Sequence, residues 1–583
     1  MSKDRSAEIF PNPRPDRRFL PNVPSKGASR RGDNQRYFAD FDVSVREPGR
    51  GGRELAEGRV VDLSNTGMLV DVRHDLAPGD AVVLKFFLNA GTMPEGYESR
   101  VTIPARVVRL DQAAGLVAFQ FEGDIASYMR KRRWRYMESL SLLLIFVVLL
   151  AIAFIKQESV FYFWFDVPVF LYGLCSVVFL LSRFLFAALY RSFPVDPDYT
   201  PTVSVIIPCF NEEEWIDKTI RSCLDQRYPE DKLEVVAVDD GSSDDSLGVL
   251  QRLKERIAPE VGDRFQVLAL GENQGKRHAL AAGARIAKGE LLVFVDSDSF
   301  LRPDAVLNVV QPLKNPRIAA ATGRCEVENK WTNFLTKMQA VRYFIGFRVF
   351  KAAESIFDVV TCLSGPLSCY RKTVVMEHLD AWIGQTFFGR PATFGDDRSL
   401  TNFLLKKSHA VYQHTAVCST IVPSSYAKFY KQQMRWKRSW LREGLRAAGF
   451  MWRKEPFMAL SFYAGLVLPV IAPVVVVRAF VFVPLVYHVF PYMYCLGILL
   501  MGMLMCCSYL LIKRSSLWIY GVPFCLFYLV VLLWQMIPAT VTFWKSDWGT
   551  RPSKFDRVDG DGRTGPTAGQ EPCAGKACGQ EKG

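Results

Sequence analysis

Two short motifs in the second half of the chain contain residue types that are suited to group-transfer chemistry. The first, Thr393–Arg398, places two aspartates, Asp396 and Asp397, directly after a glycine. A carboxylate in such a place can take the proton of an attacking hydroxyl as a general base. One aspartate is enough for that role, and the other can cap the helix that the sequence predicts over residues 399–405. The alternative is that both acids only cap that helix.

The second motif is Gln432–Trp436, in a segment with the pattern of an amphipathic helix. Gln432, Arg435 and Trp436 stand at helical positions i, i+3 and i+4, so they share one face. From that face the arginine can clamp a diphosphate, and the tryptophan can stack on a sugar or a base. Further cations favour a helix at a membrane surface, namely Lys428, Lys431, Lys437, Arg438 and Arg442. The alternative is an interfacial helix with no part in catalysis.

Acidic pairs also follow two apolar strands upstream. Asp296 and Asp298 close one of them, and two carboxylates one residue apart can hold Mg²⁺ or Mn²⁺ through oxygen. Such an ion can bridge a diphosphate and neutralise the charge of a departing nucleotide. Asp239 and Asp240 close the other strand and suit contacts with a base edge and a ribose, although they can also be helix N-caps.

Lys276 and Arg277 open a further predicted helix, where two cations beside free helical amides suit a diphosphate. The alternative is a salt-bridged surface pair. The elements that position all these residues alternate, with strands predicted at 203–208, 233–238, 265–270 and 291–295, and helices at 212–226, 244–257 and 275–287. This alternation predicts a doubly wound α/β sheet, in which ligands bind beyond the carboxyl ends of the strands.

The N-terminal part has short strands of alternating hydrophobicity, separated by turn residues. The expected strands are 37–45, 59–61, 67–72, 81–87, 101–108 and 116–121. This pattern predicts a small closed β-barrel.

A basic run before the barrel and a D-x-S-x-x-G turn within it suit a nucleotide, because arginines grip phosphates and the turn offers acceptors and amides. The residues concerned are Arg30, Arg31, Arg36, Asp62, Ser64 and Gly67. The segment resembles a PilZ domain, the bacterial receptor module for cyclic di-GMP, whose signature is R-x-x-x-R followed by D/N-x-S-x-x-G. The spacing from Arg31 to Arg36 is one residue longer than in that signature. The alternative is therefore a barrel that only mediates contacts.

Apolar runs flank the α/β region on both sides. They cover residues 140–155 and 167–190 before it, and 457–477, 479–489, 494–512 and 517–541 after it. The first two runs can each span a bilayer, the first of them barely, whereas residues 457–489 are short for two full spans. The later runs give four spans if residues 457–489 form a hairpin, and three if they form one span, which Lys513 and Arg514 favour. The basic segment 130–135 places the barrel and the α/β region in the cytoplasm.

Composition agrees with a membrane protein. The chain has 583 residues, of which 49% are hydrophobic, and a formal net charge of +13. This apolar content is typical of a chain with several spans, and we assign the excess charge to cytoplasmic flanks. We expect no binding to a nucleic acid polymer, because neither a basic helix nor an aromatic-studded sheet motif is present. The 13 cysteines lack the spacing of a metal site or a disulfide framework. The N-terminus lacks the apolar segment of a cleavable signal peptide.

Taken together, the motifs of residues 138–551 resemble those of processive family 2 glycosyltransferases, in particular hyaluronan synthases and then chitin and chito-oligosaccharide synthases. The motifs are CFNEEE (209–214), VDDGS (238–242), GKR (275–277), VDSDS (295–299), SGPLSCYRK (364–372), FGDDRSLTN (394–402), QQMRWKRSW (432–440) and WGTR (548–551). The resemblance implies a GT-A fold, a UDP-sugar donor and inversion at the anomeric centre.

The resemblance also implies roles for single residues. Asp397 is the base, Asp298 binds the Mg²⁺ or Mn²⁺ ion, and Asp240 contacts the uridine. The further donor contacts that it implies are Lys276, Arg435 and Trp436. The residues that it places at the acceptor are Trp382, Ser364, Gly365 and Pro366.

We therefore predict a multidomain chain with the following organisation. It comprises a disordered N-terminus (1–28), a PilZ-like β-barrel (29–128), two transmembrane helices (138–191), a GT-A domain (200–422), interfacial helices with Q-x-x-R-W (423–455), a C-terminal bundle favoured as four helices (456–543) and a disordered tail (552–583).

The predicted function is that of a bacterial inner-membrane synthase whose barrel and transferase domain are cytoplasmic. It extends and secretes a β-linked polysaccharide from a UDP-sugar under activation by cyclic di-GMP, and its product is hyaluronan-like or another glycan with GlcNAc or glucose. Two alternatives remain open. One is a non-processive lipid glycosyltransferase, and the other is a membrane scaffold that binds cyclic di-GMP and carries an inactive transferase domain.

Overall fold

The computed structural model describes residues 37–49, 52–72, 76–88, 99–111, 115–125, 128, 134–161, 167–513 and 515–545. The two expected tails lie outside these ranges, as do Arg30, Arg31, Arg36 and the WGTR motif. The chain forms two compact units. The first unit comprises Met1–Val178, Asn329–Gly346 and Val474–Val531, and the second comprises Phe179–Glu328, Phe347–Pro473 and Leu532–Gly583.

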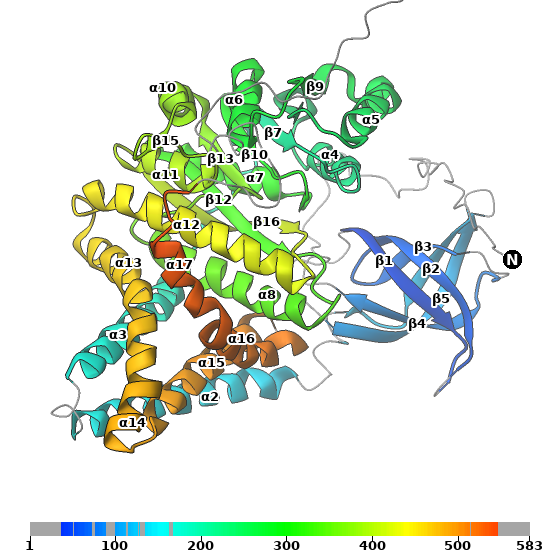
Figure 1. Cartoon of the computed structure of the whole chain (residues 1–583). Coiled ribbons are helices and arrows are strands. Elements are labelled where there is room, and N and C mark those ends of the chain that lie inside the picture. Colours follow the sequence, from blue (N-terminus) through cyan, green and yellow to red (C-terminus); the bar gives the residue numbers. More distant parts are fainter. Residues whose placement is uncertain are drawn as a thin grey trace, which may run out of the picture. The chain divides into compact units, whose positions relative to one another are not determined.

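Six antiparallel strands of the first unit close into a barrel in the order β1-β2-β3-β6-β5-β4, drawn in blue in Figure 1. They are β1 (Tyr37–Arg46), β2 (Glu54–Leu63), β3 (Gly67–Asp71), β4 (Ala81–Leu88), β5 (Ser99–Asp111) and β6 (Leu116–Phe121). Every second residue of β4 from Val82 to Leu88 is buried, so the alternating pattern of the sequence directs one face of the strand into the barrel. The predicted closed barrel is confirmed.

An eight-stranded sheet forms the centre of the second unit, in the order β11-β16-β12-β13-β10-β7-β8-β9. Its strands are β7 (Val203–Cys209), β8 (Leu233–Asp239), β9 (Phe265–Ala269), β10 (Leu291–Phe294), β11 (Ser299–Leu301), β12 (Ile318–Val327), β13 (Ser368–Arg371) and β16 (His409–Thr420). The four strands expected from the sequence, β7 to β10, are parallel, whereas β13 is antiparallel to both β10 and β12. The α/β prediction is confirmed. The sheet is mixed because β13, which does not belong to the alternating series of strands and helices, runs antiparallel to both of its neighbours.

Helices of the second unit link the predicted motifs to this sheet. They include α4 (Ile216–Leu224), α5 (Ser246–Val261), α6 (Lys276–Ile286), α7 (Ala305–Val310), α9 (Ala352–Ser355), α10 (Lys372–Ile383), α11 (Asp396–Leu405) and α12 (Tyr426–Met451). The helix α6 packs on β7 and β8, α10 packs on both α6 and α11, and α11 packs on α12. A two-stranded hairpin, β14 (Thr386–Phe387) and β15 (Arg390–Pro391), lies between α10 and α11 in the sequence. These contacts connect α6, which begins with Lys276 and Arg277, and α12, which carries Gln432–Trp436, to α11, which begins with Asp396 and Asp397.

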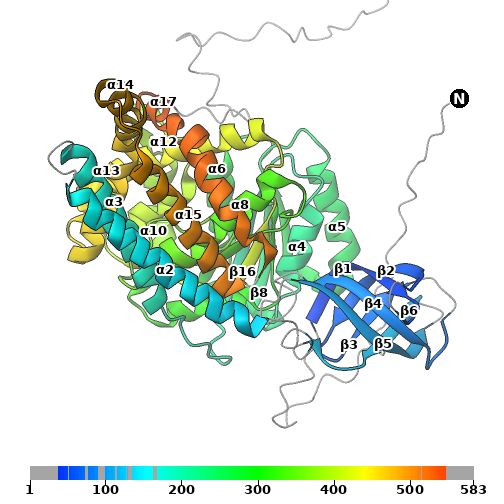
Figure 2. The same ribbon diagram turned by 90° about the horizontal axis from the view of Figure 1, so that it is seen from below.

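Among the residues that the structure describes, four helical stretches are long and apolar enough to cross a membrane. They are Val167–Leu189, Pro456–Tyr487, Tyr494–Lys513 and Ser516–Thr540, and a shorter apolar helical stretch covers Leu140–Ile155. The corresponding helices include α2 (Trp134–Phe161), α3 (Val167–Leu189), α13 (Pro456–Val477), α15 (Tyr492–Lys513), α16 (Gly521–Phe527) and α17 (Met536–Thr540). In the first unit, α15 packs along α2, as Figure 2 shows, and α8 (Phe334–Ile345) packs on α15 and α16.

In the later apolar region the structure differs from the hairpin of the predicted four-helix bundle and has the single stretch that Lys513 and Arg514 favour. Residues Pro456–Tyr487 form one helical stretch, so the residues described after position 455 contain three such stretches where four were expected. The prolines at 469 and 473 lie inside α13 without ending it, and a π-helical turn at Arg478–Phe482 continues the stretch. A proline removes only one backbone donor, and π-turns accommodate such local mismatches. The chain reverses later, where His488 adopts a φ of 55°.

Candidate active site

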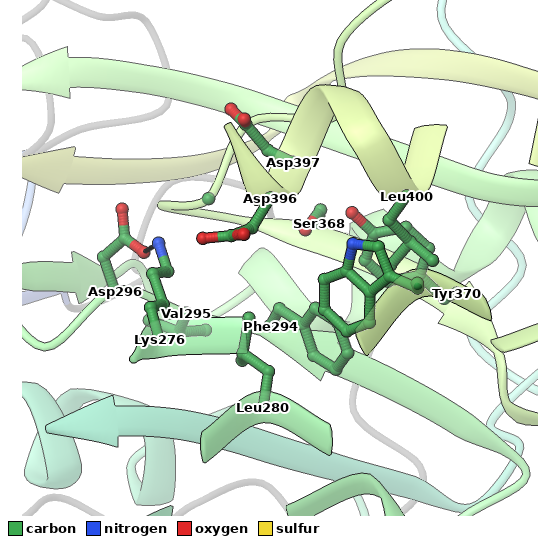
Figure 3. A pocket seen from close by; sticks show the side chains of 12 residues that line it. Lys276, Leu280, Phe294, Val295, Asp296, Ser368, Tyr370, Asp396, Asp397 and Leu400 are labelled. Carbon is green, nitrogen blue, oxygen red and sulfur yellow. Dashed lines mark hydrogen bonds and ion pairs between the residues drawn. The ribbon is translucent and has the colours of Figure 1, made fainter. Parts of the chain in front are cut away.

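A small pocket lies at the carboxyl end of β10 (Figure 3). Six residues that the sequence predicted for the site line it, namely Lys276, Asp296, Gly365, Trp382, Asp396 and Asp397. The remaining lining residues are Leu280, Phe294, Val295, Ser368, Tyr370 and Leu400. Because these residues come from α6, β10, β13, α10 and α11, the pocket forms only when the sheet and its helices assemble.

Lys276 and Asp296 form an ion pair in this pocket, marked by a dashed line in Figure 3. Lys276 is the first residue of α6. Burial acts to lower the pKa of Lys276, but the carboxylates of Asp296, Asp396 and Asp397 outweigh it, and the pKa is raised. The ammonium group is therefore charged. Gly365 borders the pair so closely that an added Cβ would lie 2.8 Å from both carboxylate oxygens of Asp296.

Arg277 turns away from that pair into the protein core. Its Nε donates to Asp396 Oδ1 at 2.8 Å, and each side chain is only 5% exposed. Its Nη1 donates to the carbonyl oxygen of Trp382 at 2.9 Å. The position of Lys276 and Arg277 in the sequence predicts both of them at a diphosphate. Successive helical residues project about 100° apart, so only one of them faces the crevice while the other reaches α11.

The two adjacent aspartates have different surroundings. Asp396 is buried and paired with Arg277, whereas Asp397 is only half-buried. Asp397 Oδ1 accepts from the backbone N–H of Arg398 at 2.8 Å, and Oδ2 accepts from the thiol of Cys362 at 3.4 Å. Burial and the Asp397 charge raise the pKa of Cys362 to about 11, so the thiol keeps its proton. In Figure 3 the carboxylate of Asp396 points toward Lys276 and that of Asp397 points away from it.

Gly395 sets the start of the helix that carries both acids. It is the N-cap of α11 and adopts a φ of 82°, a conformation that a glycine takes without a steric penalty. Neither Asp396 nor Asp397 is therefore the N-cap. This excludes the alternative in which the two aspartates serve only as N-caps of the helix. A Cβ at Gly395 would also collide with Ser439 Oγ of α12. The glycine thus allows α11 and α12 to approach each other.

A fully buried ion pair on α12 reinforces this junction. Arg442 and Glu443 are 0% and 1% exposed, and Arg442 Nε lies 3.2 Å from Glu443 Oε1. Arg442 also donates to the carbonyl oxygen of Phe394, directly before Gly395. Glu443 accepts further hydrogen bonds from Arg446, Gln385 and Asn402. The run of cations predicts Arg442 at a membrane surface, but the structure buries it beside Phe394, because it lies on the helical face of Arg435, seven residues earlier.

The predicted donor residues of α12 stand apart from the pocket. Gln432, Arg435 and Trp436 do not line it in the part of the chain that the structure describes. Trp436 is 36% exposed, and Gln432 Oε1 accepts from Gln433 Nε2 at 3.4 Å. Their share in a donor site therefore stays a prediction, and the helix that carries them is fixed to the acid motif through Arg442.

The acids after β8 organise the loop that precedes α6. Asp240 accepts from the backbone N–H groups of Gln274 and Gly275, each at 2.8 Å. Burial raises its pKa to about 6 in spite of these two bonds. Asp239 accepts from the backbone N–H of Ser242 at 3.2 Å, and its other carboxylate oxygen is buried with no hydrogen-bond partner in the described residues. An unsatisfied buried oxygen is costly, so this position fits a ligand that donates a hydrogen bond.

The Asp296–Asp298 pair fits a divalent cation that shares its ligands with a substrate. Among the described residues, no cluster of three or more metal-ligating side chains occurs. Mg²⁺, however, is commonly bound by one or two carboxylates together with substrate phosphates and water. Asp298 Oδ1 accepts from Thr420 Oγ1 at 3.2 Å, which holds its carboxylate in place, and Asp296 is held by Lys276. Two fixed hard-oxygen donors at a strand end suit such an ion.

Of the predicted acceptor residues, Trp382 and Gly365 line the pocket, and Ser364 and Pro366 flank Gly365 in the chain. Trp382 is 1% exposed, and its indole N–H is buried with no partner among the described residues. The backbone N–H of Ser364 donates to Thr322 Oγ1 at 3.2 Å, which anchors the turn that continues into Gly365 and Pro366. A buried indole donor beside a glycine turn fits a hydroxyl-bearing ligand.

The D-x-S-x-x-G turn of the barrel connects β2 and β3. Ser64 Oγ donates to the carbonyl oxygen of Gly67 and accepts from its backbone N–H, each at 3.0 Å. An added Cβ at Gly67 would lie 2.5 Å from the carbonyl oxygen of Phe119. Asp62 and Ser64 are both buried. The turn is therefore built by its own serine and glycine, and the three arginines predicted beside it lie outside the described residues.

Sequence reasoning missed several residues that shape the site. Cys362, to which the sequence pattern assigns no role, contacts Asp397, and Ser368 and Tyr370 line the pocket from β13. The short strand β13 gives little local signal, so its residues could not be assigned. Arg442 and Glu443 could have been found, because a charged pair on the same helical face as Arg435 continues the motif toward the protein core.

Two family models match the chain. Residues 204–379 match glycosyl transferase family 2, and residues 29–138 match the PilZ domain. The first match contains the acids after β8 and β10, the start of α6 and the Ser364–Pro366 turn.

Curated relatives cover the transferase region. A hyaluronan synthase of Streptococcus pyogenes serotype M3 is 36% identical over 279 residues, which are 47% of this chain and 65% of that protein. An N-acetylglucosaminyltransferase of Mesorhizobium japonicum is 34% identical over 290 residues, 47% of this chain and 66% of that protein. The chain thus spans a little less than two thirds of the relatives that it matches.

Among solved structures, a mannosyltransferase from Pyrobaculum calidifontis in complex with GDP-Man and Mn²⁺ aligns with 64% of this chain and 98% of its own. The sequence identity is 21% and the TM-score 0.43, a likeness too weak to bear on function. The family models and the curated relatives carry the identification. The chain contains a family 2 glycosyltransferase domain at residues 204–379 and a PilZ domain at residues 29–138.

Proposed function

We propose that this protein is a membrane polysaccharide synthase that transfers sugar from a UDP-sugar to a growing β-linked chain with inversion. The observation that carries the proposal is the pocket in which Lys276, Asp296, Asp396, Asp397 and Trp382 meet. A cation for a diphosphate, acids for a metal ion and a base, and a buried aromatic ring are groups that suit sugar transfer from a nucleotide. The apolar helices support a membrane location, and the relatives named hyaluronan synthase and N-acetylglucosaminyltransferase support a glycan product.

The donor side begins at the two acids after β8. Asp239 accepts a hydrogen bond from the nucleoside through its unpartnered oxygen, and Asp240 holds the Gln274–Gly275 amides that lead into α6. The diphosphate then reaches the N-terminus of α6 and the ammonium group of Lys276, which releases Asp296 from its ion pair. Arg435 and Trp436 cover the donor from α12. Asp296 and Asp298 would hold Mg²⁺ or Mn²⁺, which supplies positive charge to the leaving diphosphate.

The acceptor side is formed by Trp382 and the Ser364–Pro366 turn. A hydroxyl of the growing chain donates its proton to Asp397 while its oxygen attacks the anomeric carbon of the donor. UDP leaves from the opposite side of that carbon, so the new bond has inverted configuration. Asp396 takes no proton in this scheme, because its carboxylate is committed to Arg277. Stacking on aromatic faces lets the product slide after each transfer, which suits a processive enzyme.

The direct test is UDP release by the purified full chain in detergent, with a panel of labelled UDP-sugars and either Mn²⁺ or Mg²⁺. We expect release with at least one donor, loss of release with EDTA, and a polymer that specific glycosidases digest. The panel also identifies the sugar, since pocket shape and not motif decides it. Binding of nucleotide without turnover of any UDP-sugar would instead favour an inactive transferase domain on a membrane scaffold.

The pKa of Asp240 gives a pH dependence for donor binding. Because this pKa is raised to about 6, the carboxylate takes up a proton as the pH falls through 6 and then loses acceptor capacity for the loop before α6. We expect the affinity for UDP to fall about tenfold from pH 7 to pH 5. Calorimetric titration with UDP at both pH values measures it. The titration of UDP itself contributes equally in the wild type and in every variant. The Kd for UDP should therefore change less between pH 7 and pH 5 in Asp240→Asn than in the wild type. An equally large change would contradict the assignment.

We further propose that the barrel binds cyclic di-GMP and that binding raises turnover in the cytoplasm at the inner membrane. The ordered Ser64–Gly67 turn and the PilZ match support this assignment. The double variant Arg31→Ala/Arg36→Ala should weaken cyclic di-GMP binding about 10²- to 10⁴-fold, because it removes two charged phosphate contacts that are each worth about 1.5–3 kcal/mol. Calorimetry and stimulation of UDP release measure it. Arg46→Ala, which removes an exposed salt bridge with Glu54 in the barrel, is the matched control and should keep stimulation.

A further inference from the structure

The last apolar helical stretch, Ser516–Thr540, loses its regular α-helical pattern near its end. Tyr528–Leu532 form a π-helical turn and Leu533–Gln535 a 3₁₀ turn before α17 begins at Met536. In a regular α-helix the backbone N–H of Met536 would bond the carbonyl of Leu532, but here it bonds the carbonyl of Leu533. The α-helical hydrogen-bond pattern is therefore interrupted here, so the Leu532 carbonyl does not accept from Met536 as it would in a regular α-helix. We call this segment, Tyr528–Gln535, the helix break. Breaks of this kind inside helices often occur at functional positions.

Two side chains join α12 to this break. Lys437 Nζ donates to the carbonyl oxygen of Leu532 and, at 2.9 Å, to Gln535 Oε1. Gln535 Nε2 donates in turn to the carbonyl oxygen of Tyr430 at 3.0 Å. Gln535 is 0% exposed, so both ends of a buried amide are committed to α12. A buried amide in an apolar helix is costly unless it is satisfied, and here both of its partners lie on α12.

The positions of these contacts on α12 relate them to the predicted donor residues. Tyr430 and Lys437 are seven residues apart, so they share one helical face about 10 Å long. At about 100° per residue, Gln432, Arg435 and Trp436 lie on the opposite face. Ser439, Arg442 and Glu443 fall on that opposite face as well, and they contact the segment around Gly395 and α11. One side of α12 thus faces the acid motif, and the other side rests on the helix break.

We infer that Lys437 and Gln535 are positioning residues for the sugar-nucleotide donor. Together they fix one side of α12, and this holds the opposite side, with Gln432, Arg435 and Trp436, toward the transferase site. This inference rests on the proposed function, in which that face covers the donor. Without these two side chains, α12 keeps its contacts to α11 and the apolar contacts of Leu441 with Met536 and Ala539, but it loses its hydrogen bonds to the helix break. Donor binding is then expected to weaken more than the chemical step.

The test compares the full-length protein in detergent with Lys437→Met, with Gln535→Leu and with the double variant. We expect each single variant to raise both KM for the UDP-sugar and the Kd for UDP about tenfold, a loss typical of a hydrogen bond to a charged group, with kcat changed less than about threefold. Because Lys437 and Gln535 share one hydrogen-bond network, the double variant should have about the same Kd for UDP as the single variant that binds UDP less tightly. Lys431→Met is the matched control, since Lys431 is exposed on the same helix, and it should bind UDP as the wild type does.

Two conservative variants separate positioning from folding. Lys437→Arg keeps a donor for both oxygen atoms and should restore the affinity for UDP, whereas Gln535→Glu keeps the acceptor for Lys437 but loses the donor to Tyr430 and should be intermediate. An unchanged Kd for UDP in Lys437→Met and Gln535→Leu, or fully additive losses in the double variant, would overturn the inference. If the apolar variants do not fold, an unchanged Kd in Gln535→Glu overturns it as well. Failure of the wild type itself to bind UDP would instead overturn the proposed function.

Discussion

Asp397→Asn is expected to lower kcat for sugar transfer about 10²- to 10⁴-fold, the range typical for loss of a general base. The amide is nearly isosteric, and its one oxygen can still accept from the backbone N–H of Arg398. Its NH₂ group cannot accept from the Cys362 thiol, and the amide cannot take a proton from the acceptor hydroxyl. The affinity for UDP should change less than about twofold, because Asp397 faces the acceptor in the proposed scheme. UDP release at saturating donor measures the first quantity, and calorimetry with UDP measures the second.

Asp380→Asn is the matched control for this variant. Asp380 lies on α10 with its side chain 96% exposed, so the substitution removes the same charge outside the pocket and should leave kcat unchanged. Normal turnover by Asp397→Asn would exclude Asp397 as the base. A large fall in the affinity for UDP together with kcat would indicate that the residue holds the donor instead.

Much of the fold could be predicted because its signals are local. The strands β7 to β10 are short apolar runs followed by acids, and their ends agree with the prediction to within a residue or two. Parallel strands bring their carboxyl ends to one edge of the sheet, so Asp240 and Asp296 could be assigned to one crevice without knowledge of any long-range contact. The barrel followed in the same way from alternation, since each inward residue of β4 is apolar.

The pairing of side chains distant in the sequence could not be predicted. Arg277 and Asp396 are 119 positions apart, and nothing in the local pattern of either residue indicates the other. The same holds for Lys437 and Gln535, which lie in segments whose spacing indicated only an interfacial helix and an apolar span. Motif spacing identifies residue types at the ends of elements, whereas partners depend on how the elements pack.

The count of later apolar helices shows a different limit. Prolines at 469, 473 and 484 suggested kinks and allowed a hairpin, yet the chain continues as one helical stretch to Tyr487. A single proline in an apolar helix leaves one carbonyl without its donor, and neighbouring π-turns can absorb the distortion. The composition of such a run therefore predicts its apolar character better than the place where it reverses.

Arg277→Met is expected to lower the free energy of unfolding of the transferase domain by about 3–5 kcal/mol, because it leaves the buried carboxylate of Asp396 without its counter-charge. Both side chains are 5% exposed and lie 2.8 Å apart, so water cannot replace the guanidinium. Chemical denaturation in detergent, followed by tryptophan fluorescence, measures the change. Arg252→Met is the matched control, since its pair with Asp245 is exposed and should be worth less than about 1 kcal/mol.

The double variant Arg277→Met/Asp396→Leu separates stability from positioning. Replacing a whole buried ion pair by apolar side chains is often neutral or stabilising, so we expect most of the lost stability to return. Turnover should not return with it, because α11 then lacks the bond that fixes the acid motif beside Lys276 and Trp382. Recovery of both stability and kcat would mean that the pair only fills the core. Recovery of stability alone would assign the Arg277–Asp396 pair to the geometry of the base, which is the role that its burial at the edge of the pocket predicts.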